Sequence, residues 1–310
     1  ALPQLGALPE EVGRRWQSAS PAQLAGVAEA LAALPVDHAV AAVPDTRGGA
    51  AAGRGRLDRF LATGLDRYPE TRNHPADDGG SGLSPYLHFG QLSAHEILAA
   101  VAAREGWSPE RLGTKAAGRR AGWWGMSEGA EAFLDQLVTW RELGFNFAAR
   151  RPDAESYEAL PTWALATLAK HAGDTRPHLY TLERLERAET HDPLWNACQT
   201  QLVREGAMHN YLRMLWGKRV LEWSPSPAAA LAALRELNNR WALDGRDPNS
   251  TSGIFWCLGR YDRPWGPERP VFGTVRYMSS ANTARKLRVK RYLARYGGEP
   301  AGGRGAGYPE

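Results

Sequence analysis

The stretch that decides the fold is HDPLWNACQTQLVREGAMHNYLRMLWGKRVLEW, residues 191–223. At 3.6 residues per turn, the part from Ala207 onward places Trp216 and Trp223 on one face of a helix, about 10 Å apart along its axis. Trp195, on the preceding predicted helix, could add a third indole to a chain of oxidisable rings. An aromatic stripe with this spacing is equally typical of core packing, and both interpretations stay open.

The chain from Leu57 onward is predicted to be helical almost throughout, because apolar residues recur with a helical period and Pro, Gly or Asp mark the breaks. Ser84 is expected to cap one helix, with Pro85 at its first position. The pattern contains no β-hairpin or βαβ unit, so the predicted fold class is all-α. No GxGxxG motif follows a strand, which argues against a Rossmann-type site. Helices are predicted over 57–68, 84–104, 129–148, 162–171, 180–188, 194–205, 207–222 and 227–240.

The first 56 residues differ in character from the rest. Residues 1–34 are predicted to hold two short helices, with Ser20 and Pro21 suited to the start of the second. Residues 35–56 are rich in Gly, Pro and Ala and have no helical period, so they are predicted to be a surface linker. We therefore expect short helices and a linker over 1–56 and one helical domain over 57–310.

Composition narrows the class of protein. The chain has 310 residues, of which 43% are hydrophobic, as in soluble globular proteins. There is no apolar run of membrane-spanning length and no secretory signal pattern, so a cytoplasmic monomer without a membrane partner is expected. The two cysteines, Cys198 and Cys257, are too few for a disulfide framework or a four-cysteine metal site, and no metal is expected. The net charge is +4, and the basic segment 285–295 could hold phosphates or form a solvated helix face.

Five separated motifs resemble class II photolyases, flavin enzymes that use light to split cyclobutane pyrimidine dimers in DNA. They are SGLSPYLHFGQLSA (81–94), WRELGFNF (140–147), THDPLWNACQTQLVREGAMHNYLRMLWGKRVLEW (190–223), LNNRWALDGRDPN (237–249) and RPVFGTVRYM (269–278). The resemblance runs from about residue 35 to the end. It implies a helical FAD-binding catalytic domain, here without the N-terminal antenna domain of full-length relatives. It also implies FAD as cofactor, DNA containing pyrimidine dimers as partner, and deoxyribodipyrimidine photo-lyase activity.

The resemblance assigns a set of residues to the cofactor shell. Ser84 and Tyr86, at a helix start, can supply a hydroxyl and backbone N–H groups to phosphates. An asparagine is implied opposite flavin N5; Asn238 is assigned to it, with Asn249 as the nearby alternative. From sequence alone Asn238 is equally well explained as a helix C-cap, and LDGRDPN as a turn with Asx bonding. The full set is Ser84, Tyr86, Arg141, Trp195, Asn196, Gln199, His209, Arg213, Asn238, Asp244, Asp247 and Asn249.

The same resemblance assigns residues to DNA. Trp140 and Trp256 would cradle a flipped-out dimer, and Trp265, in the loop YDRPWG (261–266), would fill the hole left in the duplex. An ordinary Pro-Gly surface turn is the alternative interpretation of that loop. The DNA-facing set is Trp140, Met214, Trp256, Arg263, Trp265 and Arg276.

Gln136 departs from the family pattern. Photolyases of this class have a glutamate there, four residues before Trp140, which supports the dimer carbonyls as charge develops. A glutamine can donate a hydrogen bond but cannot transfer a proton, and Asp135 lies beside it. We place Gln136 in the catalytic set with Trp216, Trp195, Trp223 and Asn238. A cryptochrome-type blue-light photoreceptor and a flavoprotein recruited to other redox chemistry are the competing functions.

Overall fold

The computed structural model describes residues 9–26, 28–75, 77, 79–115 and 121–298, and it divides into two compact units. The first unit, Ala1–Ala42, holds the short helices α1 (Glu10–Arg15), α2 (Pro21–Leu24) and α3 (Ala28–Ala32). Ser20 caps α2 in a reciprocal capping box with Gln23, as its position before Pro21 predicts. Neither α1 nor α2 has a buried residue, so neither contributes to a core.

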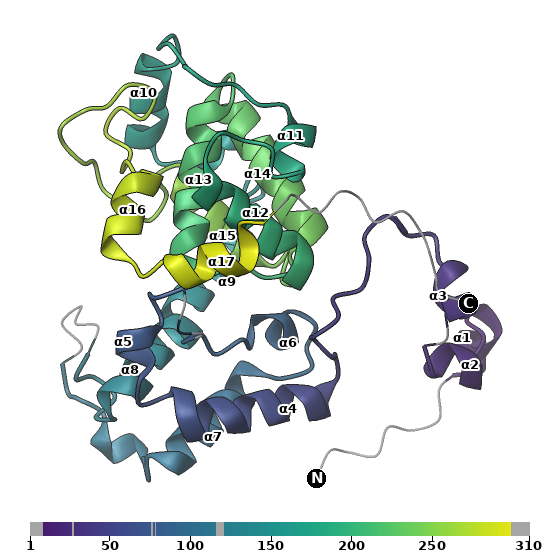
Figure 1. Cartoon of the computed structure of the whole chain (residues 1–310). Coiled ribbons are helices and arrows are strands. Elements are labelled where there is room, and N and C mark those ends of the chain that lie inside the picture. Colours follow the sequence, from purple (N-terminus) through teal and green to yellow (C-terminus); the bar gives the residue numbers. More distant parts are fainter. Residues whose placement is uncertain (1–8, 27, 76, 78, 116–120, 299–310) are drawn as a thin grey trace. The chain divides into compact units, whose positions relative to one another are not determined.

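In the described part of the second unit, Val43–Glu310, every regular element is a helix and β-structure is limited to one isolated bridge between Arg269 and Gly273, which confirms the all-α prediction (Figure 1). No helix in the described ranges combines the length and apolar character needed to cross a membrane. The elements are α4 (Ala50–Arg59), η1 (Phe60–Gly64), α5 (Tyr68–Thr71), α6 (Ser84–His88), α7 (Ala94–Arg104), η2 (Pro109–Arg111), α8 (Glu128–Leu134), η3 (Asp135–Trp140), α9 (Arg141–Arg150), η4 (Tyr157–Ala159), α10 (Thr162–Lys170), α11 (Leu182–Glu186), α12 (Pro193–Glu205), α13 (Asn210–Trp223), α14 (Pro227–Trp241), α15 (Pro248–Cys257), α16 (Ser280–Lys286) and α17 (Lys290–Tyr296).

Two local predictions differ from the structure. The linker predicted over 35–56 is helical from Ala50, where α4 begins, because alanines there allow a helix that packs Gly53 against Tyr86. The helix predicted over 84–104 is two helices, α6 and α7. Ser84 is the first residue of α6 and makes no capping bond, whereas Ser93 caps α7 by accepting from the backbone N–H of Glu96.

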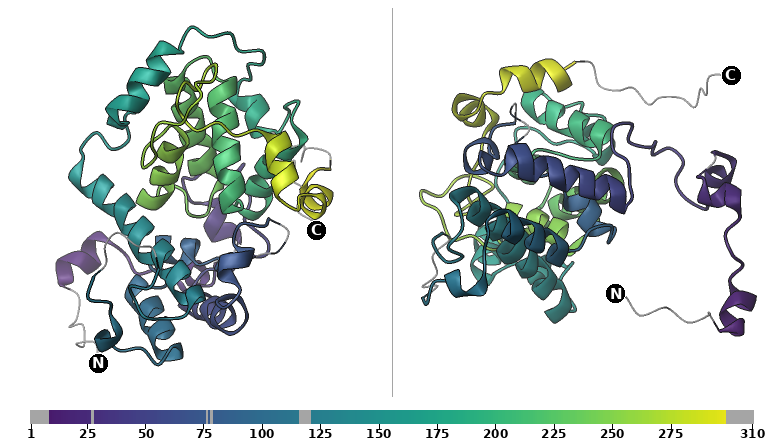
Figure 2. Two further views of the ribbon diagram at one scale, coloured as in Figure 1. Left: turned by 90° about the vertical axis from the view of Figure 1, so that its left-hand side faces the viewer. Right: turned by 90° about the horizontal axis from the view of Figure 1, so that it is seen from below.

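The second unit has two apolar cores. One is formed by side chains of α4 to α8 and η3, and the other by side chains of α9 to α17. Figure 1 and Figure 2 show these two groups of helices at opposite sides of the unit. Helix α13, which holds most of the stretch that decides the fold, packs against α12, α14 and α15. The candidate site residues are mostly carried by these four helices and by η3 and α9.

Candidate functional site

Three buried indoles form one continuous column. Trp195 stacks on Trp216 with 6.5 Å between ring centroids and 7° between planes, and it contacts Trp223 edge-on at 5.5 Å. The Trp195 Nε1 donates to the Trp216 carbonyl at 3.0 Å, and the Trp216 Nε1 donates to Gln199 Oε1 at 2.9 Å. Trp195 therefore lies between the two tryptophans of α13. The column is part of the apolar core, so packing and an oxidisable chain are both consistent with its geometry.

The outer end of this column is marked by residues that the sequence reasoning missed. Trp223 contacts the rings of Tyr180 at 5.4 Å and His191 at 5.2 Å. The Tyr180 hydroxyl is 2.6 Å from His191 Nδ1. Burial, with nearby His178 adding to it, lowers the pKa of His191, which favours a neutral ring that can accept the phenol proton. Tyr180 is only half-buried, so the aromatic contacts run from the core to the surface.

Helices α13, α14 and α15 bring a group of polar residues together. Arg213 Nη2 lies 3.5 Å from Asp244 Oδ1. The buried Asn238 donates to the Ser250 hydroxyl at 2.9 Å, and that hydroxyl lies 3.2 Å from Asn238 Oδ1. Asn238 lies inside α14, and the C-cap is Ala242, so the C-cap interpretation of Asn238 is wrong. Asp247 is the N-cap of α15, as the Asx interpretation of LDGRDPN predicts.

Some buried polar atoms on and near α13 lack a hydrogen bond in the described ranges. Asp244 Oδ1 makes none and has the Arg213 guanidinium at 3.5 Å as its charged neighbour. Both ring nitrogens of His209, the N-cap of α13, are buried without a hydrogen bond. Burial lowers the pKa of His209 to about 4. Buried polar atoms without partners destabilise a fold, and a bound polar molecule would supply the missing bonds. The residues present therefore fit a cofactor with several hydrogen-bonding groups.

Other residues of the predicted shell are engaged elsewhere. The Tyr86 hydroxyl donates to the Arg47 carbonyl at 2.9 Å, and the Asn196 amide is bonded on both sides to Thr190. Arg141 lies over the Phe145 ring and pairs with Glu142. Ser84 and Asn249 are exposed. In contrast His88, a residue of the SPYLHFG motif that was not singled out, reaches Asp247 Oδ2 at 3.4 Å and joins α6 to the polar group.

Helices η3, α9 and α15 bring Trp140 and Trp256 together. The two half-buried indoles stack with 4.5 Å between centroids and 27° between planes. Gly144 allows this, because a Cβ there would lie 2.9 Å from the Asn249 Cα, so α9 and α15 meet at their backbones. The resemblance paired these two indoles, but neither their spacing nor the helical periodicity indicated that their rings stack on each other.

Asp135 takes part in this arrangement. Its Oδ2 accepts from Trp140 Nε1 at 3.0 Å and from Gln136 Nε2 at 3.1 Å. Asp135 and Trp140 are five residues apart in the π-helix η3, whose wider turn places such residues on one side. Short π-helical segments occur frequently at functional sites. The carboxylate therefore fixes the amide of Gln136 and the ring of Trp140 at once.

The loop after α15 holds the remaining DNA candidates. Trp265 has the guanidinium groups of Arg263 and Arg276 over its ring, at 4.4 and 4.9 Å from the centroid. Its Nε1 donates to Asp262 Oδ1 at 2.9 Å within its own turn. Met214, on α13, is half-buried against the core. The structure thus gathers Arg263, Trp265 and Arg276 into one cationic and aromatic cluster.

The chain is similar to known proteins in sequence and in fold. No family model matches the sequence. The chain is 40% identical over 252 residues to a deoxyribodipyrimidine photo-lyase of Methanothermobacter thermautotrophicus, covering 81% of this chain and 51% of that protein. It is 40% identical over 262 residues to one of Potorous tridactylus, covering 84% and 46%. A cryptochrome of Synechocystis sp. PCC6803 matches in fold with a TM-score of 0.59 at 19% identity, over 84% of this chain and 47% of that one. The chain spans about half the length of the curated relatives that it matches.

Proposed function

Because this chain belongs to the photolyase family, we propose that it is an FAD-dependent lyase that repairs pyrimidine dimers in DNA under blue light. The observation that carries the proposal is the Trp140–Trp256 pair. Two half-buried indoles stacked on each other at 4.5 Å offer aromatic surface against which the two linked bases of a dimer can pack. A protein that only signals has no need for such a surface.

The polar group between α13, α14 and α15 would hold the FAD. Arg213, Asp244 and His209 have the unsatisfied or weakly paired atoms, and Asn238 offers both a donor and an acceptor through its amide. FAD would supply light-driven one-electron transfer when bound. Arg213 and Asp244 would offer a pair of opposite charges to the cofactor, and Asn238 is kept in place by Ser250. The tryptophan column would connect this site to the surface at Tyr180.

The proposed contacts with DNA use a different set of side chains from the cofactor site. Trp140 and Trp256 stack too closely for a base to lie between them, so they must part or offer an outer face to an extruded dimer. Gln136 gives one N–H to Asp135 and keeps its second N–H for a dimer carbonyl. Arg263 and Arg276 would contact phosphates, and Trp265 would stack in the duplex where the lesion was.

The deciding experiment is an absorption spectrum of the purified protein, followed by illumination with a dimer-containing oligonucleotide. We expect one non-covalent FAD per chain and light-dependent loss of the dimer. Trp256→Ala should lose binding to the lesion, whereas Trp241→Ala, a half-buried indole bonded to Glu186 outside this site, should not. Colourless protein that takes up no added FAD would contradict the whole proposal. A flavoprotein that repairs no pyrimidine lesion under light would contradict the lyase assignment.

A cryptochrome-type photoreceptor is the second candidate. It is favoured by the aromatic column, which reaches the half-buried Tyr180 and does not require a lesion, and by Gln136 in place of a carboxyl group. A photoreceptor would photoreduce its flavin but bind damaged and intact duplex equally. A flavoprotein recruited to other redox chemistry would also bind damaged and intact duplex equally, but it would show no light response. Replacement of Trp265 should reduce the preference for damaged duplex only in the lyase.

A further inference from the structure

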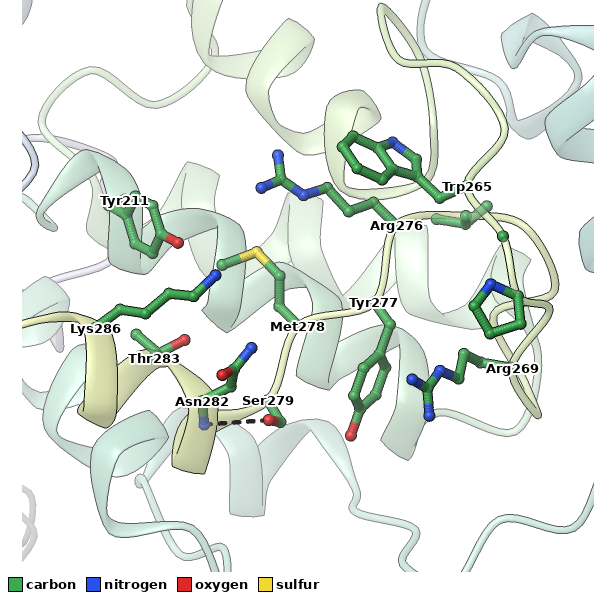
Figure 3. Close-up of a pocket in the computed structure, with 13 residues that line it drawn as sticks. Tyr211, Trp265, Arg269, Arg276, Tyr277, Met278, Ser279, Asn282, Thr283 and Lys286 are labelled. Carbon is green, nitrogen blue, oxygen red and sulfur yellow. Dashed lines mark hydrogen bonds between the residues drawn. The ribbon is translucent and has the colours of Figure 1, made fainter.

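A pocket of about 290 Å³ lies between the loop that follows α15 and helix α16 (Figure 3). Its wall contains cationic, aromatic and neutral polar side chains but no aspartate or glutamate. The absence of carboxylates from the wall makes a cation an unsuitable ligand and an anion a suitable one. The pocket is lined by Tyr211, Trp265, Gly266, Pro267, Arg269, Val275, Arg276, Tyr277, Met278, Ser279, Asn282, Thr283 and Lys286.

Three cations of this wall have no anionic partner in the described ranges. Arg269 lies over the Tyr277 ring at 5.6 Å and Arg276 over the Trp265 ring at 4.9 Å, while Lys286 makes no ion pair there. Figure 3 shows the Lys286 side chain extending toward the tip of Met278, on the side of the pocket where Arg276 lies. Other cations of the same unit are neutralised, as Lys170 is by Glu268 at 2.7 Å. The pocket therefore concentrates uncompensated positive charge.

The volume of the pocket and its neutral side chains limit which class of anionic ligand fits. A volume of about 290 Å³ is at the lower end of small-molecule sites, which typically span about 300–1,000 Å³. It suits a phosphate group with its sugar better than a complete dinucleotide. Asn282 and Thr283 add hydrogen-bonding groups, and the rings of Tyr277 and Trp265 add flat apolar surface. Phosphate contacts from Arg and Lys position a strand without reading its sequence.

The location links the pocket to the candidate lesion site. The loop that forms the pocket begins at Tyr261, whose ring lies 6.3 Å from Trp256, and it carries Trp265 and Arg276. We propose that the pocket binds a backbone phosphate of the DNA strand, with Lys286 and Arg276 as its charged contacts. This inference rests on the proposed DNA-binding function and adds Lys286 and the pocket to the phosphate contact assigned to Arg276.

The test compares two adjacent cations of α16. Lys286→Gln removes a pocket cation, and Arg285→Gln removes an equally exposed charge that does not line the pocket. Binding to a dimer-containing duplex is measured in the dark as a function of salt. Each phosphate contact contributes roughly one to the slope of log K against log salt, so Lys286→Gln should lower that slope by about one and Lys286→Arg should restore it. Arg285→Gln should change it much less.

A second measurement identifies the ligand. Duplexes with a single neutral methylphosphonate are scanned along the strand. One position should weaken binding by the parent protein but not by Lys286→Gln, because both changes remove the same contact. An unchanged salt slope for Lys286→Gln would overturn the inference while leaving the lyase proposal intact. Binding of inorganic phosphate that depends on Lys286, with no sensitive methylphosphonate position, would assign the pocket to a free phosphate and also overturn it. A parent protein that binds no DNA would instead contradict the proposed function itself.

Discussion

At the scale of the residue, Trp216 is the most informative position of the aromatic column. It is buried and stacks on Trp195 with nearly parallel rings, and only Trp195 connects it to Trp223. Because a phenyl ring is much harder to oxidise than an indole, Trp216→Phe should block most of the light-driven reduction of bound FAD. The bleaching of the yellow absorbance under blue light with a reductant measures this. Trp241→Phe is the control outside the column, and an undiminished rate in Trp216→Phe would leave the indoles as packing alone.

Gln136 supports a second prediction, because the resemblance implies a carboxyl group at its position. Gln136→Glu should raise the repair yield per absorbed photon. A hydrogen bond to a group that gains charge during the reaction is typically worth roughly 2.7–4 kcal/mol, and the variant should gain part of that stabilisation. Asp135 Oδ2 lies 3.1 Å from the present amide, so two carboxyl groups would share one site and the pKa of one would rise. The gain should therefore shrink as pH rises and that proton is lost.

The control for this variant is Thr139→Glu, which adds a carboxylate at an exposed position of the same helix η3. Flavin absorption should stay unchanged in both variants. A Gln136→Glu variant that repairs no better than the parent at any pH would show that this side chain does not support the dimer carbonyls.

His209 makes stability depend on pH. Its ring nitrogens are buried without partners, and burial lowers its pKa to about 4, below the ordinary value near 6.5. Between these values the unfolded chain binds a proton that the folded chain does not, so stability present above about pH 6.5 is lost as pH falls toward 4. The loss amounts to about 3 kcal/mol at most. His209→Gln in flavin-free protein should flatten the pH dependence of the urea midpoint, and exposed His95→Gln should not. Parallel curves for all three proteins would contradict this.

At the scale of the element, the periodic apolar pattern predicted part of the helices that form the larger core. Helices α12, α13 and α14 were located to within three residues at each end, and Asp192 and Ser226 cap two of them. Helix α15 was not predicted, because its Ser, Thr and Gly residues favour helix weakly and its stability comes from the Asp247 cap and packing on α9. The contact of Asp135 with Trp140 depends on the wider π-helical turn of η3, which a period of 3.6 residues does not reveal.

The packing of α9 on α15 gives a prediction for that pair of helices. A Cβ on Gly144 would lie 2.9 Å from the Asn249 Cα and 3.0 Å from the Pro248 carbonyl oxygen, and neither atom can move without moving the backbone. Gly144→Ala should destabilise the fold by about 1–3 kcal/mol and weaken the preference for damaged DNA, because it separates α9, which directly follows Trp140, from α15, which carries Trp256. The urea midpoint measures the change in stability, and a binding competition between damaged and intact duplex measures the change in preference.

The matched control is Gly253→Ala in α15. Its added Cβ would meet nothing within 4 Å, and alanine favours a helix over glycine by up to about 1 kcal/mol. This variant should be as stable as the parent or more stable. Equal stability of the two alanine variants would show that the close approach at Gly144 does not limit the packing of the two helices.

At the scale of the whole molecule, the candidate site belongs to one of the two units. Every residue assigned to the cofactor, the tryptophan column or DNA lies within Val43–Glu310, and both apolar cores lie there as well. In Ala1–Ala42, Trp16 and Leu24 are exposed, and α1 and α2 bury no side chain. The stability and the proposed chemistry are therefore expected to reside in the second unit.

Deletion of residues 1–42 tests that expectation. Because neither α1 nor α2 has a buried residue, the free energy of unfolding should change by less than about 1 kcal/mol, which corresponds to at most about 2–4 °C in melting temperature for a domain of this size. FAD content, the rate of light-driven flavin reduction and the affinity for dimer-containing duplex should match those of the full chain. Calorimetry and the flavin absorbance of the two proteins, purified in parallel, provide the comparison. A shortened protein that loses its FAD or melts ten or more degrees lower, an effect of roughly 3 kcal/mol, would show that residues 1–42 stabilise the flavin site.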